Sequence, residues 1–129
     1  MSRIKGKDTS IEIKVRKYLF SQGFRYRKNV KTLPGKPDIV LPKYHAVVFV
    51  HGCFWHRHPG CIKAYTPKTR VEFWQKKFES NIQNDVLHQK ELIDAGWRVF
   101  IIWECEVEKD LEKTTSGLIE QLRSYKANL

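Results

Sequence analysis

Five side chains of the types that bind transition metals fall within eleven consecutive residues: His51, Cys53, His56, His58 and Cys61. The chain has one further cysteine, Cys105, which follows a distant apolar run. A structural zinc ion takes four ligands in a tetrahedron, and three cysteines with one histidine are a common set. We therefore predict a closed zinc site that ties this segment to a sheet, although spacing alone does not choose its histidine. Buried thiols beside surface histidines are the alternative.

Asp38 is the second candidate for metal chemistry. It follows Leu33–Pro37, which contains two prolines and a glycine and is predicted to be a loop. The β-branched runs 38–41 and 46–50 predict an antiparallel hairpin, which brings Asp38 and the Val50 carbonyl to one edge of a sheet. A hard divalent cation held there by oxygen ligands, with a remaining histidine as general acid or base, would suit phosphodiester hydrolysis. An aspartate in this position can also be only a turn residue.

Two more acidic residues are candidates with competing structural explanations. Thr9–Glu12 has the pattern of a helix capping box, in which Glu12 needs no further role. Asp85 lies beside the apolar stripe of a second predicted helix, where a carboxylate needs a basic partner. Asp85 is therefore either a buried structural partner or part of the site.

Large aromatic residues surround the metal-binding segment. Phe54 and Trp55 lie within it, and Trp74 opens the next predicted helix. Such rings are either core residues or wedges that insert between base pairs and kink a duplex. The wedge interpretation is favoured by the nearby cations Arg57, Lys63, Lys68 and Arg70.

The segments that must position these residues alternate between helical and strand periodicity. Helices are predicted from residue 9 to 23, from a second capping box at 69–72 to residue 96, and around Leu118, Leu122 and Tyr125. Strands are predicted at 24–27, 38–41, 46–50 and 97–103, the last being the most apolar and so predicted to be central. The helical stripes are Ile11, Val15, Tyr18 and Leu19, then Trp74, Phe78, Ile82 and Leu92. The expected order is α-β-β-β-α-β-α, and the irregular stretch 51–68 needs a metal or a function to order it.

The charge distribution favours a nucleic-acid partner. The 129-residue chain carries a net charge of +10, and residues 1–37 hold eleven cations against two acids. A basic end of this kind is typical of proteins that bind the phosphate backbone, although a solvated basic surface is the alternative. The sequence has no apolar run of membrane-spanning length and no apolar signal segment. We expect one globular cytoplasmic domain over 1–129, with a basic N-terminal arm at 1–10.

Several motifs together resemble the very short patch repair DNA mismatch endonucleases: Leu33–Asp38, Val48–His58, Glu72–Trp74, Gly96–Val99 and Trp103–Cys105. The resemblance covers Ile4 to Glu106. It implies a restriction-endonuclease-like α/β fold with a mixed central sheet flanked by helices. It also implies a monomeric bacterial enzyme at the nucleoid that nicks duplex DNA 5′ of the thymine in a T·G mismatch, with mismatch-repair factors as partners. The implied cofactors are Mg²⁺ for catalysis and Zn²⁺ for structure.

The resemblance assigns roles residue by residue. Asp38 is implied to be the metal-binding catalytic aspartate, with the Val50 carbonyl as a second Mg²⁺ ligand, and His56 the catalytic histidine. The implied supporting positions of the catalytic site are Glu12, His51 and Asp85. The implied zinc ligands are Cys53, His58, Cys61 and Cys105, and the implied intercalating aromatics are Phe54, Trp55 and Trp74. Beside these rings we predict further DNA contacts from Arg57, Lys68 and Arg70.

The chain departs from related patterns at three places. Val50-His51-Gly52 occupies the position of the acid-x-lysine signature of restriction enzymes, so the usual catalytic lysine is absent and the family's histidine replaces it. Val50 stands where some family members have a threonine, and Pro59-Gly60 is an insertion between two implied zinc ligands. Two rival functions are a non-catalytic, zinc-stabilised module that binds DNA mismatches and a restriction-like enzyme that cuts both strands of matched DNA.

Overall fold

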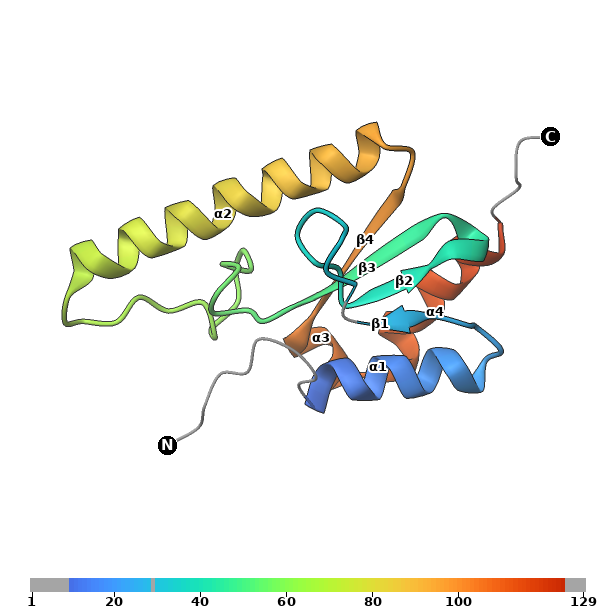
Figure 1. Cartoon of the computed structure of the whole chain (residues 1–129). Coiled ribbons are helices and arrows are strands. Elements are labelled where there is room, and N and C mark those ends of the chain that lie inside the picture. Colours follow the sequence, from blue (N-terminus) through green and yellow to red (C-terminus); the bar gives the residue numbers. More distant parts are fainter. Residues whose placement is uncertain (1–9, 29, 125–129) are drawn as a thin grey trace.

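The computed structural model describes residues 10–28 and 30–124 and arranges them as an α/β fold (Figure 1). Its helices are α1 (Ser10–Ser21), α2 (Val71–Asp94), α3 (Glu104–Lys109) and α4 (Leu111–Arg123). Its strands are β1 (Arg27–Lys28), β2 (Ile39–Leu41), β3 (Ala46–His51) and β4 (Arg98–Trp103), with a 3₁₀ helix, η1 (Pro42–Tyr44), between β2 and β3. Within these described ranges, no helix is both long and apolar enough to cross a membrane.

The strands form a mixed sheet in the order β1-β2-β3-β4. β2 and β3 are antiparallel, with Ile39 opposite Val48, which confirms the predicted hairpin. β4 runs parallel to β3, and its last residue, Trp103, lies opposite His51. A parallel neighbour requires a long crossover, which is supplied here by residues 52–70 and α2. This topology brings the start of β2 and the ends of β3 and β4 to one end of the sheet.

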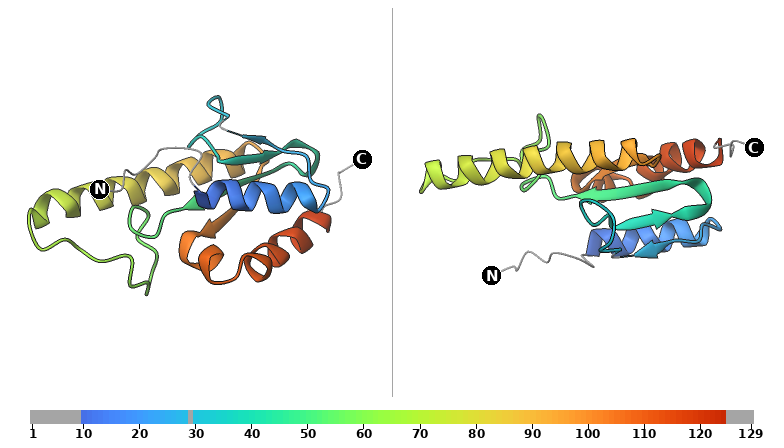
Figure 2. Two further views of the ribbon diagram at one scale, coloured as in Figure 1. Left: turned by 90° about the horizontal axis from the view of Figure 1, so that it is seen from below. Right: turned by 45° about the horizontal axis from the view of Figure 1, so that its top comes forward.

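Helices cover both faces of the sheet (Figure 2). On one face α1, α3 and α4 enclose the larger core, which includes Val15, Leu19, Val48, Ile102 and Leu122. On the other face α2 covers a smaller core of Val40, Val47, Phe49 and Leu92. Successive residues of β3 alternate between these two cores, because side chains of a strand point to opposite faces. Burial on both faces explains why the strands of this chain read as nearly continuous apolar runs.

The first helix agrees with its prediction within the described residues. Tyr18 is half-buried at the edge of its stripe, and the buried stripe residues are Ile11, Val15 and Leu19. Gly23 follows the helix with φ 91°, in the left-handed region that favours glycine. The predicted N-cap Thr9, residues 1–9 of the predicted arm, and Tyr125 of the last predicted helix lie outside the described residues. Ser10, the last residue of the predicted arm, is the first residue of α1.

The strand predicted at 24–27 is displaced. The observed strand is β1, Arg27–Lys28, which pairs with β2. Phe24 instead belongs to the larger core, where its ring lies 5.2 Å from that of Tyr44. The alternation of apolar and basic residues that suggested a strand here therefore marks an extended connection after α1, in which Phe24 is buried and Arg25 is exposed.

The second helix differs from its prediction at its start and in its middle. Arg70 occupies the N-cap position with φ 55° and makes no side-chain cap hydrogen bond, so the capping box predicted at 69–72 is wrong. The first half of α2 extends beyond the sheet (Figure 1), and the predicted stripe residue Ile82 is 44% exposed. Apolar spacing predicts the apolar side of a helix but not the extent of the sheet beneath it.

β4 is a strand as predicted, but it is not central. In the described sheet it pairs with β3 and lies at the end of the strand order. Its apolar sequence reflects burial on both faces, since Phe100 and Ile102 pack toward the larger core and Val99 and Ile101 toward the smaller one. The expected order of elements also lacks α3, which directly follows β4 and contains Cys105.

Candidate active site

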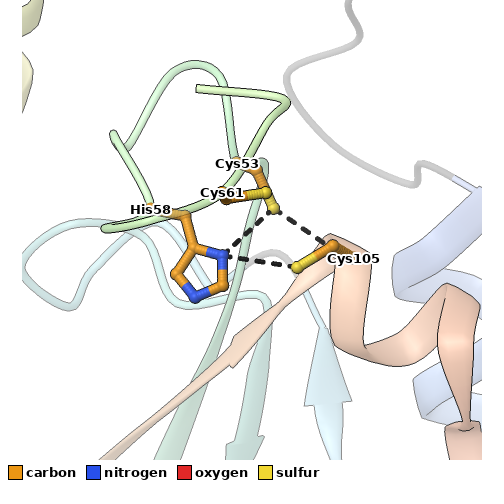
Figure 3. A group of neighbouring side chains, drawn as sticks. All are labelled: Cys53, His58, Cys61 and Cys105. Carbon is orange, nitrogen blue, oxygen red and sulfur yellow. Dashed lines mark hydrogen bonds between the residues drawn. The ribbon is translucent and has the colours of Figure 1, made fainter. Parts of the chain in front are cut away.

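The side chains implied to bind zinc lie together (Figure 3). One ligand atom from each of Cys53, His58, Cys61 and Cys105 lies within 4.8 Å of all the others. His58 Nδ1 is 3.6 Å from Cys53 Sγ and 3.3 Å from Cys105 Sγ. A nitrogen and a sulfur bound to one tetrahedral zinc ion are separated by about 3.6 Å. The cluster of four donors therefore fits a closed tetrahedral zinc site.

The zinc-ligand cluster joins the loop after β3 to the start of α3. Cys105 N donates a hydrogen bond to Cys53 Sγ at 3.4 Å, and Cys53 N donates one to Glu104 Oε1 at 3.2 Å. Burial is the main cause that raises the pKa of the Cys53 thiol to about 12. A bound metal cation is what would stabilise the thiolate form of this sulfur.

A cleft of about 940 Å³ lies beside this cluster, between the first turn of α1, the loop after β3, and α2. It is lined by all the predicted catalytic residues: Glu12, Asp38, His51, His56 and Asp85. Lys77, Asn81 and His88 line it from α2. The fold therefore gathers in one cleft acidic and histidine residues from separate segments of the chain.

Asp38 lies just before β2 and faces the end of β3. Its Oδ2 accepts a hydrogen bond from Val50 N at 2.6 Å, the convergence expected from the hairpin. Burial first, and the neighbouring Glu12 carboxyl second, raise the pKa of Asp38 to about 8. Arg16 lies 3.6 Å from Glu12 and donates a hydrogen bond to the Asp38 carbonyl at 3.1 Å. Two adjacent carboxyls beside a cleft are a suitable donor set for a divalent cation, whose charge would keep both of them ionised.

His51 and His56 form a stacked pair in the cleft. Their ring centroids are 3.8 Å apart and their planes are 6° from parallel. His56 Nδ1 lies 2.6 Å from Asp85 Oδ2, so Asp85 has the basic partner that its place on α2 requires. Burial, and to a smaller extent the neighbouring His56, lowers the pKa of His51 to about 4.

Together with Asp85, the two histidines are close enough to be considered as ligands of one metal ion. Parallel stacked rings, however, direct their in-plane lone pairs side by side rather than toward one point. This arrangement suits a proton-transfer group better than a metal site.

The aromatic residues of the loop pack against the start of α2. The Phe54 ring lies 5.1 Å from that of Trp55 and 5.5 Å from that of Trp74, between centroids. Phe78, which is buried, lies 5.3 Å from Phe54. The three predicted wedge residues are half-buried, and more exposed apolar side chains lie close by in the sequence: Ile62, Tyr65 and Phe73. The loop and the start of α2 therefore present exposed apolar surface of the kind found at interaction sites.

The three predicted basic DNA contacts differ in their surroundings. Lys68 and Arg70 are exposed just before α2. Arg57 is half-buried, has φ 55°, and its guanidinium lies 3.8 Å from the centroid of the Phe78 ring. It also donates hydrogen bonds to the carbonyls of Phe54, Ala64 and Tyr65. The structure thus uses the Arg57 side chain inside the loop, and its predicted contact with DNA stays a prediction.

The chain is similar along most of its length to proteins of one family. A family model described as DNA mismatch endonuclease Vsr matches residues 1–63. The DNA mismatch endonuclease Vsr of Escherichia coli strain K12 is 39% identical over 125 residues, which cover 97% of this chain and 80% of that protein. This chain belongs to the Vsr family of DNA mismatch endonucleases. The type II nicking enzyme V.NmeAIP of Neisseria meningitidis is 50% identical over 108 residues, covering 84% of this chain and 76% of that protein. The type II nicking enzyme V.XorIIP of Xanthomonas oryzae is 45% identical over 107 residues, which cover 83% of this chain and 78% of that protein.

Sequence reasoning missed three residues that support the site of this Vsr-family chain: Arg16, Trp103 and Glu104. Arg16 follows Glu12 by four residues on a helix, a spacing that brings side chains together and was a usable signal. Glu104 directly precedes a predicted zinc ligand, but its partner Cys53 is far away in the sequence. The Trp103 ring contacts His51 and His58, and these contacts had no local signal because they join three separate segments.

Proposed function

We propose that this protein nicks one strand of duplex DNA, on the 5′ side of the thymine in a T·G mismatch, by magnesium-dependent phosphodiester hydrolysis. The observation that carries the proposal is that two hydrogen-bonded pairs, Asp38 with Val50 and His56 with Asp85, line a single cleft. Family membership supports the reaction class, since relatives are named a mismatch endonuclease and nicking enzymes. It also supports a restriction-endonuclease-like fold around the mixed sheet, and we propose that residues 1–129 act as one catalytic domain.

We place the Mg²⁺ ion at the end of the cleft where Asp38 lies. The ligands that we propose are the Asp38 carboxylate and the Val50 carbonyl, with Glu12 adjacent. When bound, the ion supplies positive charge against the negative charge that develops on the phosphate oxygens. The chain itself orients this donor set, because Val50 N holds the Asp38 carboxylate and Arg16 holds the Asp38 carbonyl.

His56 is proposed to transfer the proton. Asp85 at its Nδ1 orients the ring and favours the tautomer that carries a proton on that nitrogen, so Nε2 is the atom that exchanges a proton with the reacting groups. His51 lies flat against His56 and restricts the plane of its ring. This pair takes the place of the lysine of restriction enzymes, whose position is occupied here by Val50-His51-Gly52.

Zn²⁺ is proposed to be structural and to be held by Cys53, His58, Cys61 and Cys105. Four protein ligands leave no open position for water, so the ion would have no catalytic role. Its role would be to order the loop that carries His56. The half-buried rings of Phe54, Trp55 and Trp74 are proposed to insert beside the mispair, where unstacking costs less than in matched DNA. Exposed Lys68 and Arg70 would contact phosphates beside them. The protein would act as a monomer on one mismatch, in the bacterial cytoplasm at the nucleoid, with mismatch-repair factors as partners.

The test is cleavage of end-labelled duplexes, matched and T·G-mismatched in several sequence contexts, with Mg²⁺ or EDTA, resolved on a denaturing gel. We expect a single Mg²⁺-dependent nick on the thymine strand of mismatched duplexes. Mismatch binding without any product would favour the non-catalytic binding module. Breaks in both strands of matched DNA would favour the restriction-like enzyme.

Four variants test the assigned roles in the same assay. Asp38→Ala and His56→Ala should keep the fold and the affinity for the mismatch but lose nicking. The matched controls Asp94→Ala and His45→Asn change the same residue types outside the cleft and should nick normally, since Asp94 is exposed and asparagine tolerates the left-handed φ of 50° at His45. Normal turnover by either site variant would contradict the mechanism.

A further inference from the structure

Trp103 links the zinc-ligand cluster to the catalytic histidines. Its ring stacks on His58, with centroids 4.2 Å apart and planes 12° from parallel. It also meets the ring of His51 edge to face, at 5.2 Å and 74°. His51 in turn stacks on His56 at 3.8 Å. A continuous column of four rings therefore runs from a predicted zinc ligand to the proposed catalytic histidine, with Asp85 at its far end.

Core packing does not account for this tryptophan. Among the described residues, neither of the two hydrophobic cores includes Trp103, although the neighbouring β4 residues Phe100, Ile101 and Ile102 belong to them. Its ring is half-buried and packs between two histidines. Its backbone lies directly opposite His51 in the parallel β3–β4 pair, so the sheet itself sets the distance between these two residues.

The orientation of His51 depends on ring packing. The residue is only 4% exposed, and its buried Nδ1 has no hydrogen-bond partner within the described part of the chain. The rings that surround it are those of Phe49, His56 and Trp103. Rotation of an imidazole about its last side-chain torsion is only weakly restricted by local sterics. The neighbouring rings must therefore hold the plane of His51, and with it the plane of His56.

We infer that Trp103 is a positioning residue, which passes the rigidity of the zinc-held loop to His51 and so fixes the ring of His56. This inference rests on the proposed function only in treating His56 as the group whose placement sets the rate. Trp103 need not contact DNA or either metal ion to act in this way. It stacks flat on His58 and meets the His51 ring at a steep angle, and an aliphatic side chain offers neither contact.

Trp103→Leu tests the inference because leucine keeps an apolar side chain but removes the ring. Misplacement of a catalytic group by about 1 Å can slow a reaction on the order of 10²-fold, so we expect kcat for nicking to fall roughly 10- to 100-fold. KM for the mismatched duplex should change by less than about twofold, because the wedge residues and the exposed cations are untouched. Trp103→Phe, which retains a ring, should restore most of the rate.

Trp97→Leu is the matched control. Trp97 directly precedes β4 at the opposite end of the sheet. Its ring stacks on His45 in a similar way, with centroids 4.5 Å apart and planes 10° from parallel. It packs against the smaller core rather than the cleft. This variant should be less stable but should keep the kcat of the unmodified protein.

The measurements are kcat, KM, zinc content and the NMR signals of the histidine rings, all on the zinc-loaded full chain. In Trp103→Leu we expect stoichiometric zinc, reduced kcat, and shifts of the His51 and His56 ring protons as the ring current of the tryptophan is lost. Unchanged kcat with unmoved His56 signals would overturn the inference. Parallel loss of zinc and activity would also overturn it, since the defect would then lie in the zinc site.

Two further measurements keep the inference testable on its own. If Trp103→Leu does not fold, nuclear Overhauser contacts between the Trp103 indole and the His51 ring in the unmodified protein decide whether the column exists, and their absence would overturn it. Absence of nicking by the unmodified protein would overturn the proposed function, whereas the histidine signals of the variants would still report on Trp103.

Discussion

Replacing Arg57 tests whether this side chain holds the loop together or contacts DNA. Its guanidinium donates hydrogen bonds to Ala64 O at 2.8 Å and Tyr65 O at 3.0 Å, and longer ones to Phe54 O and Thr66 Oγ1 at 3.2 and 3.3 Å. The planar fork of five donors suits such a set of acceptors. Because one acceptor, Phe54, precedes Arg57 and the others follow Cys61, Arg57 closes the loop on itself.

The structure gives an approximate magnitude for Arg57→Ala. Two short hydrogen bonds contribute about 1 kcal/mol each, and the stack on Phe78 adds about 0.5–1 kcal/mol. Part of this network is exposed, so we expect the free energy of unfolding to fall by about 2 kcal/mol. That corresponds to a decrease in Tm of roughly 6–8 °C for a domain of this size. Arg57→Lys keeps the charge but cannot reach several carbonyls at once, and should lose most of the same stability.

Thermal unfolding and the salt dependence of mismatch binding together separate the two roles. A loop role leaves the slope of log K against log salt unchanged in Arg57→Ala, because that slope counts neutralised phosphates at about 0.9 each. Lys68→Ala is the matched control, since Lys68 is exposed; it should lower the slope by about 0.9 without changing Tm. An Arg57→Ala protein with unchanged Tm and a slope reduced by one phosphate would refute the loop role and support the DNA contact.

Three more substitutions have defined outcomes. Cys105→Ala should release zinc and lower Tm, measured by metal analysis and thermal unfolding; stoichiometric zinc with full stability would contradict the zinc assignment. Asp85→Asn should slow single-turnover nicking on the order of 10²-fold or more with little change in mismatch affinity, and an unaltered rate would remove Asp85 from the mechanism. Gly35→Ala should lower the unfolding free energy by about 1–3 kcal/mol, since φ is 73° and the new Cβ would lie 2.9 Å from His88 Cβ. In denaturant titrations Gly117→Ala, which meets nothing within 4 Å, should not be destabilised.

The hairpin that places Asp38 beside Val50 could be predicted because its signals are local. Two β-branched runs separated by a short turn have essentially one way to pair, and the observed register, with Ile39 opposite Val48, follows from it. The position of β4 could not be predicted in this way. Burial on both faces produces the same apolar run in an edge strand and in a central one, so the sequence around Ile101 does not determine strand order.

The clustering of the cysteines with one histidine could also be predicted, because these residue types are uncommon and have few structural uses in such a pattern. Arg57, Trp103 and Glu104 are different. Their residue types have many ordinary roles. The partners of Trp103 and Glu104 lie in other segments, and those of Arg57 lie in an irregular loop without a periodic pattern, so these contacts become visible only when the chain is folded. The same limit applies to Asp85, for which the sequence left open a buried structural partner or a part of the site; its contact with His56 in the cleft became visible only in the structure.

The proposed catalytic histidine lies inside the loop that carries most of the candidate zinc ligands, and not in either hydrophobic core. Residues 52–70 contain little buried apolar surface, and Ile62 within them is 92% exposed. The loop is held instead by short turns, by the four candidate zinc ligands, by Arg57, and by the packing of Phe54 and Trp55 against α2. His56 lies between these supports, whereas the two hydrophobic cores are built from the sheet and its helices. Changes in the cores should therefore alter the free energy of unfolding and leave His56 in place, whereas changes in the loop, such as Arg57→Ala, should alter both the free energy of unfolding and the position of His56.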